Sequence, residues 1–341
     1  MKYDVITIGT ATRDIFLKSK DFKILKDANH LKAVGIPGGE AECLALGSKI
    51  DIENPVLTTG GGATNAAVTF ARQGYKTACI ASLGNDSGAA DIIGDLTAEG
   101  ITPIISRSKK HGSGYSTLLL TTTGERTVLV YRGAANDLQD KELALSSLRA
   151  KWVYITPSGI SLPVILRLVK HFKKNGSKIA MNPSGFYLAL GAKKLQPLLK
   201  MLDVVTMNRE EAALLTEQPI EDERAIFQAL DKLIDGVVAM TEGPQGSLVA
   251  SSDVILQAGI LKEKIMADRT GAGDAYGSGF VAGLLASASE GEESLRLGMR
   301  LGSANSTAVV EHLGAKKGIL TKEQFQKDRR WKKLKITKIN K

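Results

Sequence analysis

Short apolar runs and amphipathic segments alternate along most of the chain, most regularly from residue 152 onward. The clearest amphipathic segment spans 162–174, where apolar side chains recur every three or four residues and so lie on one face of a helix. Strands that alternate with helices are joined by crossovers and become neighbours in a parallel sheet. The pattern predicts an α/β fold with a mainly parallel sheet covered by helices on both faces. We expect strands at 5–8, 152–155, 178–181, 204–207 and 237–240, and helices at 63–72, 162–174, 194–201, 210–216, 224–234, 272–286 and 294–312.

Two β-rich segments interrupt this pattern in the first half of the chain. The first contains strand-like runs at 42–46 and 49–52, and the second contains runs at 115–121 and 127–131, joined through a glycine turn at 123–125. We expect the two segments to form one small sheet, a lid. The predicted core therefore comprises 1–14, 60–104 and 138–326, the lid comprises 15–59 and 105–137, and a basic tail occupies 327–341.

The charge of the chain is concentrated at one end. The net charge is +9, and the segment 327–341 holds eight basic residues and one acid, which is +7 of that total. Because the rest of the chain is nearly balanced, we expect a solvated basic tail and no nucleic-acid partner. An RNA-binding tail is the alternative, and its affinity would be sensitive to salt.

Membrane and metal sites are not indicated by the sequence. No apolar run approaches the roughly eighteen residues that a membrane span needs. The chain starts directly with a strand-like stretch, without the apolar region and cleavage site of a secretory signal, so we expect a cytoplasmic protein. The two cysteines, Cys43 and Cys79, and the four scattered histidines have no disulfide or metal-ligand spacing.

The segment from Asp268 to Phe280, DRTGAGDAYGSGF, carries the most informative chemical pattern. Its small residues make a turn that opens a long helix, where free N–H groups and the helix dipole favour a phosphoryl oxyanion. Asp274 in the first helical turn could accept a proton from an attacking hydroxyl while the turn holds the transferring phosphate. The alternative is an acid that only complements the helix dipole.

Three further segments each allow a binding role and a structural one. The run GGGATN, from Gly60 to Asn65, permits close approach of a ligand, or is a tight strand-to-helix turn; it lacks the lysine and spacing of known nucleotide loops. Asp14 follows the first strand, at the sheet edge where ligands bind, or belongs to a turn. Asn208 and Glu211, three residues apart, could reach magnesium-bound waters or phosphate, or form a helix-capping box.

In their order along the chain, the four segments resemble those of the ribokinase-like family of carbohydrate kinases, also called the phosphofructokinase-B (PfkB) type, and the resemblance extends over nearly the whole chain. The resemblance implies an ATP-dependent kinase that uses Mg²⁺ and phosphorylates a hydroxyl of a sugar or nucleoside. It also suggests a monovalent cation near Asp268 and Thr270. The larger lid is compatible with a homodimer contact.

The resemblance also implies roles for individual residues. Asp274 would be the catalytic base, and the anion hole would be formed by Gly271, Ala272 and Gly273. Substrate hydroxyls would be bound by Asp14, Gly61, Gly62 and Asn65. The nucleotide side would comprise Asn182, Asn208, Glu211, Thr241, Gly243 and Asn305, with Asn305 near the adenine and Glu211 reaching Mg²⁺ through water.

Departures from the family pattern bear on the identity of the substrate. Gly62 stands where ribokinases have a lysine, and no glutamate lies near Pro157 and Ser158, which argues against a ribokinase proper. Tyr131 and Arg132 resemble the Tyr-Arg pair of 2-keto-3-deoxygluconate kinases. Arg132, like Arg13 and Arg107, could face an anionic substrate or be an ordinary surface residue.

Two readings compete with the kinase. A sensor would keep the fold and the pockets and bind small molecules without transferring phosphate, although an intact Asp274 and anion hole argue against it. An RNA-associated protein would depend on the tail 327–341. If the kinase reading holds, removal of that tail is expected to leave turnover unchanged.

Overall fold

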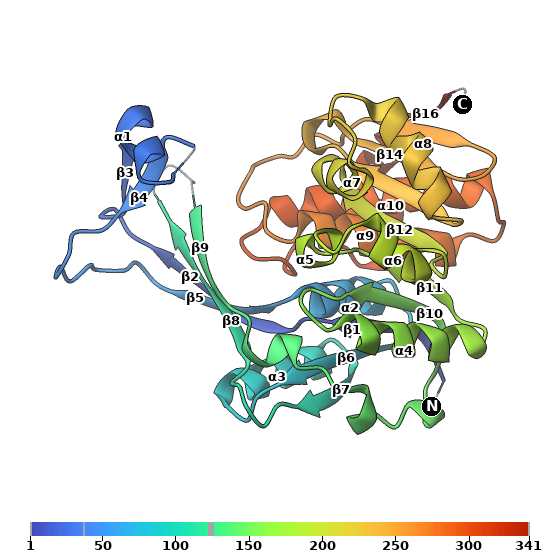
Figure 1. The fold of residues 1–341 in the computed structure, drawn as a ribbon, viewed down its shortest axis with the longest axis horizontal. Coiled ribbons are helices and arrows are strands. Elements are labelled where there is room, and N and C mark those ends of the chain that lie inside the picture. Colours follow the sequence, from blue (N-terminus) through green and yellow to red (C-terminus); the bar gives the residue numbers. More distant parts are fainter. Residues whose placement is uncertain (1, 37, 122–125, 340–341) are drawn as a thin grey trace.

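The computed structural model describes residues 2–36, 38–121 and 126–339. Within them, ten strands form one sheet, which runs through the larger body on the right of Figure 1, from β7 near the bottom to β16 near the top. Neighbours from β7 to β13 are parallel and the last three strands are antiparallel, so the expected mainly parallel sheet is confirmed. In sheet order the strands are β16 (Ile336–Ile339), β15 (Ile255–Ala258), β14 (Ser247–Ala250), β13 (Val237–Thr241), β12 (Val204–Asn208), β11 (Lys178–Met181), β10 (Arg149–Thr156), β1 (Lys2–Gly9), β6 (Thr77–Leu83) and β7 (Thr102–Arg107).

Helices cover both faces of this sheet, as the sequence predicted. Successive residues of β1 point to opposite sides: Val5 packs among α2 and α9, whereas Ile6 packs among α4 and its neighbours. This double burial explains why the strands read as continuous apolar runs. One face carries α2 (Gly62–Arg72), α3 (Ser87–Ala98), α9 (Ala272–Ala286) and α10 (Glu292–Val310); the other carries α4 (Leu162–Lys174), α5 (Gly185–Leu188), α6 (Ala192–Leu199), α7 (Arg209–Thr216) and α8 (Glu223–Leu233).

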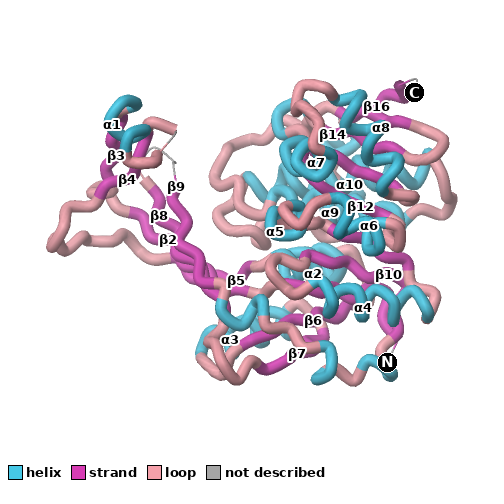
Figure 2. The backbone as a smooth tube through the Cα atoms, viewed as in Figure 1, coloured by secondary structure: helices cyan, strands magenta, loops and turns pink. Residues whose placement is uncertain are grey.

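A second, smaller sheet projects from the core (Figure 2). Its strands come from both predicted β-rich segments, in the order β5 (Val56–Gly60), β2 (Thr12–Lys18), β8 (Gly114–Leu120) and β9 (Arg126–Tyr131). A two-stranded sheet of β3 (Lys23–Lys26) and β4 (Glu40–Cys43), with α1 (Ala28–Ala33), lies at its far end.

Some details of the lid differ from the sequence-based expectation. Residues 49–52 are not a strand, and β5 was not predicted. β7 pairs with β6 in the large sheet, so residues up to 107 extend the core, and β2 begins at Thr12 in the lid sheet. The predicted turn at 123–125 lies outside the described residues.

The expectation of a solvated C-terminal tail is wrong for residues 327–339. The chain continues from α11 (Lys322–Lys327) through a 3₁₀ turn to β16, which pairs antiparallel with β15. Trp331 and Leu334 are each 4 % exposed and pack with the α9 and α10 side chains. The apolar residues interspersed among the lysines therefore complete the sheet edge, while the lysines of this segment face solvent.

No helix in the described ranges combines the length and the hydrophobicity that crossing a bilayer would demand.

Candidate active site

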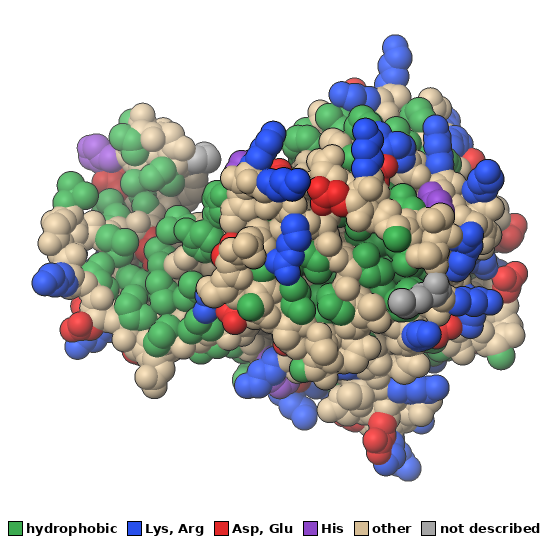
Figure 3. All heavy atoms as spheres, turned by 90° about the horizontal axis from the view of Figure 1, so that it is seen from below, with side chains coloured by type: hydrophobic (Ala, Val, Ile, Leu, Met, Phe, Trp, Pro, Cys, Tyr) green, Lys and Arg blue, Asp and Glu red, His purple; other side chains and the backbone are tan. Residues whose placement is uncertain are grey.

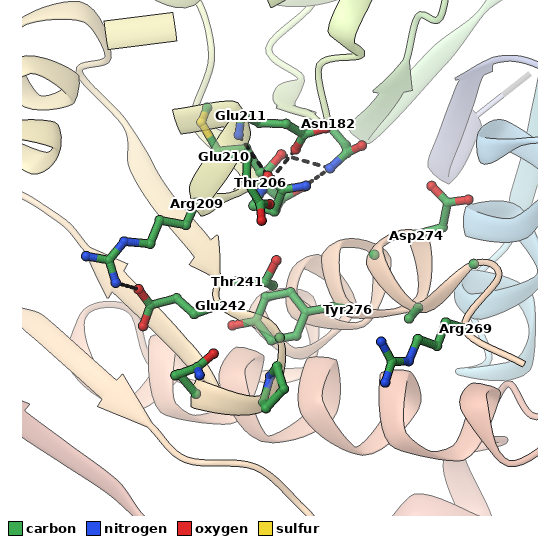
Figure 4. Close-up of a pocket in the computed structure, with 18 of the residues that line it drawn as sticks. Asn182, Thr206, Arg209, Glu210, Glu211, Thr241, Glu242, Arg269, Asp274 and Tyr276 are labelled. Atoms are coloured by element: carbon green, nitrogen blue, oxygen red, sulfur yellow. Dashed lines mark hydrogen bonds and ion pairs between the residues drawn. The ribbon is translucent and has the colours of Figure 1, made fainter. Parts of the chain in front are cut away.

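The predicted site residues gather where the parallel strands end. Asn208 and Thr241 close β12 and β13, and Asn182 follows β11, as expected at the carboxyl edge of an open α/β sheet. A groove of about 630 Å³ runs along this edge and reaches the start of α9 (Figure 4). It continues into a more apolar recess of about 340 Å³ between the β13–β14 turn and α10. A smaller pocket of about 230 Å³ lies between the core and the lid.

Asp274 stands where the groove and the small pocket meet, because it lines both, as does Gly271. Gly271 caps α9 with a φ of 79°, and an added Cβ would lie 2.4 Å from the Cβ of Ala315, so only glycine fits there. The first intrahelical bond joins Ala275 N–H to the Gly271 carbonyl at 2.8 Å. Gly273 and Asp274 precede that bond, and their N–H groups stand at the positive end of the helix dipole.

Two effects act in opposite directions on the pKa of the Asp274 carboxylate. Burial raises its pKa, and the hydrogen bond that Asn65 Nδ2 donates to its Oδ2, 2.9 Å long, partly offsets that effect. Asn65 lies in the first turn of α2 and is 5 % exposed. Its Oδ1 has no hydrogen-bond partner among the described residues, so this buried acceptor is available to a ligand hydroxyl.

The small pocket contains all four predicted substrate contacts: Asp14, Gly61, Gly62 and Asn65. Asp14 lies on β2, where Thr12 donates a 3.0 Å hydrogen bond to its carboxylate and burial raises its pKa. The glycines have packing reasons of their own, since a Cβ on Gly61 would contact the Thr10 backbone at 2.6 Å and one on Gly62 would contact Thr156 at 2.7 Å. The glycine run is therefore both a tight turn and a pocket wall.

The large groove contains the other expected nucleotide contacts except Asn305. Asn182 donates to the Thr206 carbonyl at 2.9 Å and thereby fixes the neighbouring strand ends. Asn208 and Glu211 form the capping box that the sequence left as an alternative, with reciprocal bonds of 2.8 and 2.9 Å at the start of α7. Both still line the groove, and burial raises the pKa of Glu211. Thr241 and Gly243 line the groove and the recess.

Asn305 lines neither the groove, the recess nor the small pocket, contrary to its expected place near an adenine. It is fully buried in α10, where its amide donates to Thr69 and to the Ala275 carbonyl and its Oδ1 accepts from Leu320 N–H. These bonds tie α10 to α2 and α9. The nearby recess is lined instead by Ser303, Ser306 and Thr307.

The three arginines considered for an anionic substrate lie in different places. Arg132 lines the small pocket and donates to the Ser158 hydroxyl at 3.1 Å. Arg13 pairs with Asp91 at 3.1 Å, and Arg107 donates to the Gly84 carbonyl at 2.7 Å. Of the three, Arg132 is therefore the one that lines the candidate substrate pocket.

Several residues of the site were not identified from the sequence. Thr12 and Ser116 line the small pocket from adjacent lid strands, and Tyr276 and Arg269 line both the groove and the recess. Their positions depend on strand pairing and on the direction of the α9 entry loop. Arg269 lies inside the informative motif, but nothing in its spacing signals a role.

The residues present fit a nucleotide with an oxygen-liganded cation. The groove offers helix N–H groups at one end, and Glu211 and Asn182 could supply carboxylate and amide oxygens that coordinate Mg²⁺ or accept hydrogen bonds from its bound waters. No group of three or more His, Cys, Asp or Glu side chains suited to a metal occurs in the described ranges.

The fold and site define the class of protein: an α/β core with a small β-sheet lid, and a helix start with free N–H groups beside a carboxylate. The model of the pfkB family of carbohydrate kinases matches residues 39–321, and the chain belongs to this family. A ribokinase of Haemophilus influenzae is 28% identical over 293 residues, which cover 82% of this chain and 89% of the relative. A nucleoside kinase of Methanothermobacter thermautotrophicus is 26% identical, covering 76% and 81%.

Solved structures agree with the fold. The structure of Arabidopsis thaliana ribokinase complexed with ribose and ATP has a TM-score of 0.76 at 20% identity and covers 96% of this chain and 98% of that one. The adenosine kinase of Sinorhizobium meliloti has a TM-score of 0.73 at 23% identity, covering 93% and 96%. At these identities the likeness concerns the fold alone.

Proposed function

We propose that the protein transfers the γ-phosphate of ATP to a hydroxyl of a sugar or nucleoside, with Asp274 as the base. The observation that carries this proposal is the position of Asp274, which lines both the donor-sized groove and the small pocket. An acceptor hydroxyl in the small pocket could thus give its proton to the carboxylate and face the groove. The family membership and the ribokinase and nucleoside kinase relatives support the same reaction.

Each part of the site has a task in this proposal. Asp14 and the free Oδ1 of Asn65 would orient the acceptor through its hydroxyls. The Gly271–Gly273 turn would stabilise negative charge on the transferring group through its N–H groups. ATP with Mg²⁺, held near Glu211 and Asn182, supplies the phosphoryl group, and the Mg²⁺ neutralises part of the charge on the phosphates. The lid sheet of β2, β5, β8 and β9 would close over the acceptor and exclude water.

The decisive experiment is an ADP-release assay with ATP and Mg²⁺ against nucleosides, free sugars, sugar acids and sugar phosphates. Turnover that depends on one acceptor class supports the proposal and names the substrate group. Asp274→Asn is expected to lower kcat by about three orders of magnitude or more while nucleotide binding persists, because the charge of the base is lost and its volume is kept. Binding without turnover on every acceptor would favour the sensor, and full activity in Asp274→Asn would refute the assigned base.

The lid also suggests a second copy of the chain as a partner. Its sheet exposes apolar side chains that the core does not cover, and Figure 3 shows them gathered on the lid. They include Val56, Leu57, Tyr115, Val128, Leu129, Val130 and Tyr131. Burial of such a surface between two lids would form a homodimer. Size-exclusion chromatography with light scattering should give twice the monomer mass for the wild type and the monomer mass for Leu129→Glu.

A further inference from the structure

The large groove along the carboxyl edge of the sheet is lined by more acidic than basic side chains. Its lining carries four carboxylates, from Glu210, Glu211, Glu242 and Asp274. Two arginines oppose them, and Arg209 is already engaged: it lies 2.8 Å from Glu242, which is 6 % exposed at its side chain, and donates to the Ile220 carbonyl at 2.8 Å. A nucleoside triphosphate entering this groove would meet a net negative lining in which Arg209 is already paired with Glu242.

The other arginine, Arg269, has no such commitment. Its side chain is exposed and makes no hydrogen bond or ion pair within the described ranges. It lines both the groove and the recess, and Figure 4 shows its side chain extending from the loop beside the start of α9. The backbone next to it is fixed, because Thr270 donates from N and Oγ1 to the buried Asp268 carboxylate at 2.9 and 2.8 Å. The guanidinium of Arg269 therefore has no partner within the described ranges, while hydrogen bonds hold the backbone beside it in place.

We propose that Arg269 binds a phosphate of the nucleotide donor. The inference rests on the proposed kinase function and adds to it a donor-binding residue outside the motif residues assigned so far. A guanidinium offers a planar set of donors that fits two phosphate oxygens, and such charge-assisted bonds are stronger than neutral ones. Arg269 also offsets the groove carboxylates at the point where groove and recess join. The alternative, a contact with the base in the recess, predicts a different ligand dependence.

Binding of a non-hydrolysable ATP analogue, ADP and adenosine to the full chain, measured by calorimetry, tests this assignment. Arg269→Gln is expected to weaken binding of the ATP analogue and ADP about 10- to 100-fold and that of adenosine less than about twofold. Arg269→Lys should recover part of the loss. The matched control is Arg329→Gln, which removes an exposed arginine outside all three cavities and should change nothing.

Kinetics and the binding data together separate this inference from the proposed function. With an active acceptor, Arg269→Gln should raise KM for ATP in proportion to its loss of affinity, whereas Asp274→Asn lowers kcat. If Arg269→Gln weakens adenosine binding as much as nucleotide binding, Arg269 contacts the adenine base. If the variant keeps its affinity for the nucleotides, Arg269 does not bind them. Either result overturns the inference. If wild type binds ATP without turnover on any acceptor, the kinase proposal fails while the Arg269 result still decides the inference. A protein that binds no adenine nucleotide overturns both.

Discussion

At the scale of single residues, the hydrogen bond from Asn65 is expected to set the pH at which Asp274, the proposed base, is ionised. Burial raises the pKa of Asp274 and the Asn65 amide lowers it. Because the base must be ionised, activity falls as the pH drops through that pKa. Asn65→Ala removes the lowering interaction, so the acid limb of kcat should move to higher pH.

This shift is measured as a pH–rate profile at saturating acceptor, so that weaker acceptor binding does not contribute. We expect kcat/KM to fall about tenfold or more as well, since a buried acceptor for a substrate hydroxyl is lost. A lower rate with an unmoved acid limb would mean that Asn65 only binds substrate.

The buried carboxylate of Asp14 is expected to lower the stability of the fold at neutral pH. Burial raises its pKa, so ionisation at neutral pH is less favourable in the folded than in the unfolded chain. The contribution of Asp14 to wild-type stability is fully present below its pKa in the unfolded chain, about 3.9. It is lost as the pH rises through the higher pKa of Asp14 in the folded chain. Asp14→Asn should therefore raise the free energy of unfolding at pH 7, and the gain should vanish toward pH 4.

The same variant should bind the acceptor about tenfold more weakly, because an amide replaces one carboxylate oxygen with a donor. Urea unfolding at several pH values and KM for the acceptor are the two measurements. A loss of stability at pH 7 would show that the Thr12 hydrogen bond outweighs the burial of the charge.

The site residues could be predicted where a local turn determines their place. The glycine-rich starts of α2 and α9 were recognisable because both chemistry and packing require small residues there. Asn305 shows the limit: its amide satisfies a three-helix junction, and no local pattern distinguishes such an asparagine from one in a pocket. Arg269 shows the converse, since only the assembled cavities reveal its position.

At the scale of elements, the antiparallel strands β14 and β15 were not predicted, whereas the helices α4 and α6–α10 and the parallel strands β10–β13 followed from the apolar pattern of the second half. The C-terminal segment did not, because its apolar residues are separated by lysines whose charge dominates the composition. Pairing of β16 with β15 and burial of Trp331 depend on the rest of the fold. For the same reason β5, a short lid strand paired with β2, was not predicted.

The C-terminal segment should therefore be required for stability. Trp331→Ala is expected to lower the free energy of unfolding by about 3–5 kcal/mol, the usual cost of emptying a buried aromatic site. Lys332→Gln, an exposed neighbour, is the control and should change it by less than about 0.5 kcal/mol. Denaturant unfolding checks both, and an unaffected Trp331→Ala would mean that this segment is dispensable, as the sequence first suggested.

At the scale of the whole molecule, the lid contacts the core at the loop that leads into α9. Arg126, the first described residue of β9 after the lid hairpin, lies 3.0 Å from the Asp268 carboxylate. Asp268 is 2 % exposed at its side chain and also accepts from Thr270 and from Gly314 N–H, at 3.3 Å for the latter. The position of the lid is thus linked to the loop that leads into α9.

Arg126→Ala should therefore affect catalysis more than folding. The Asp268 carboxylate keeps its Thr270 and Gly314 donors, and Arg126 itself is exposed, so we expect a change in the free energy of unfolding below about 1 kcal/mol. The lid would lose its contact beside the anion hole, and kcat/KM for the acceptor should fall about tenfold. Wild-type kcat/KM should decline with added NaCl, which screens the ion pair, and the variant should decline less. Arg126→Lys, which keeps the charge, should retain most activity; equal salt dependence in wild type and Arg126→Ala would show that the ion pair does not control the lid.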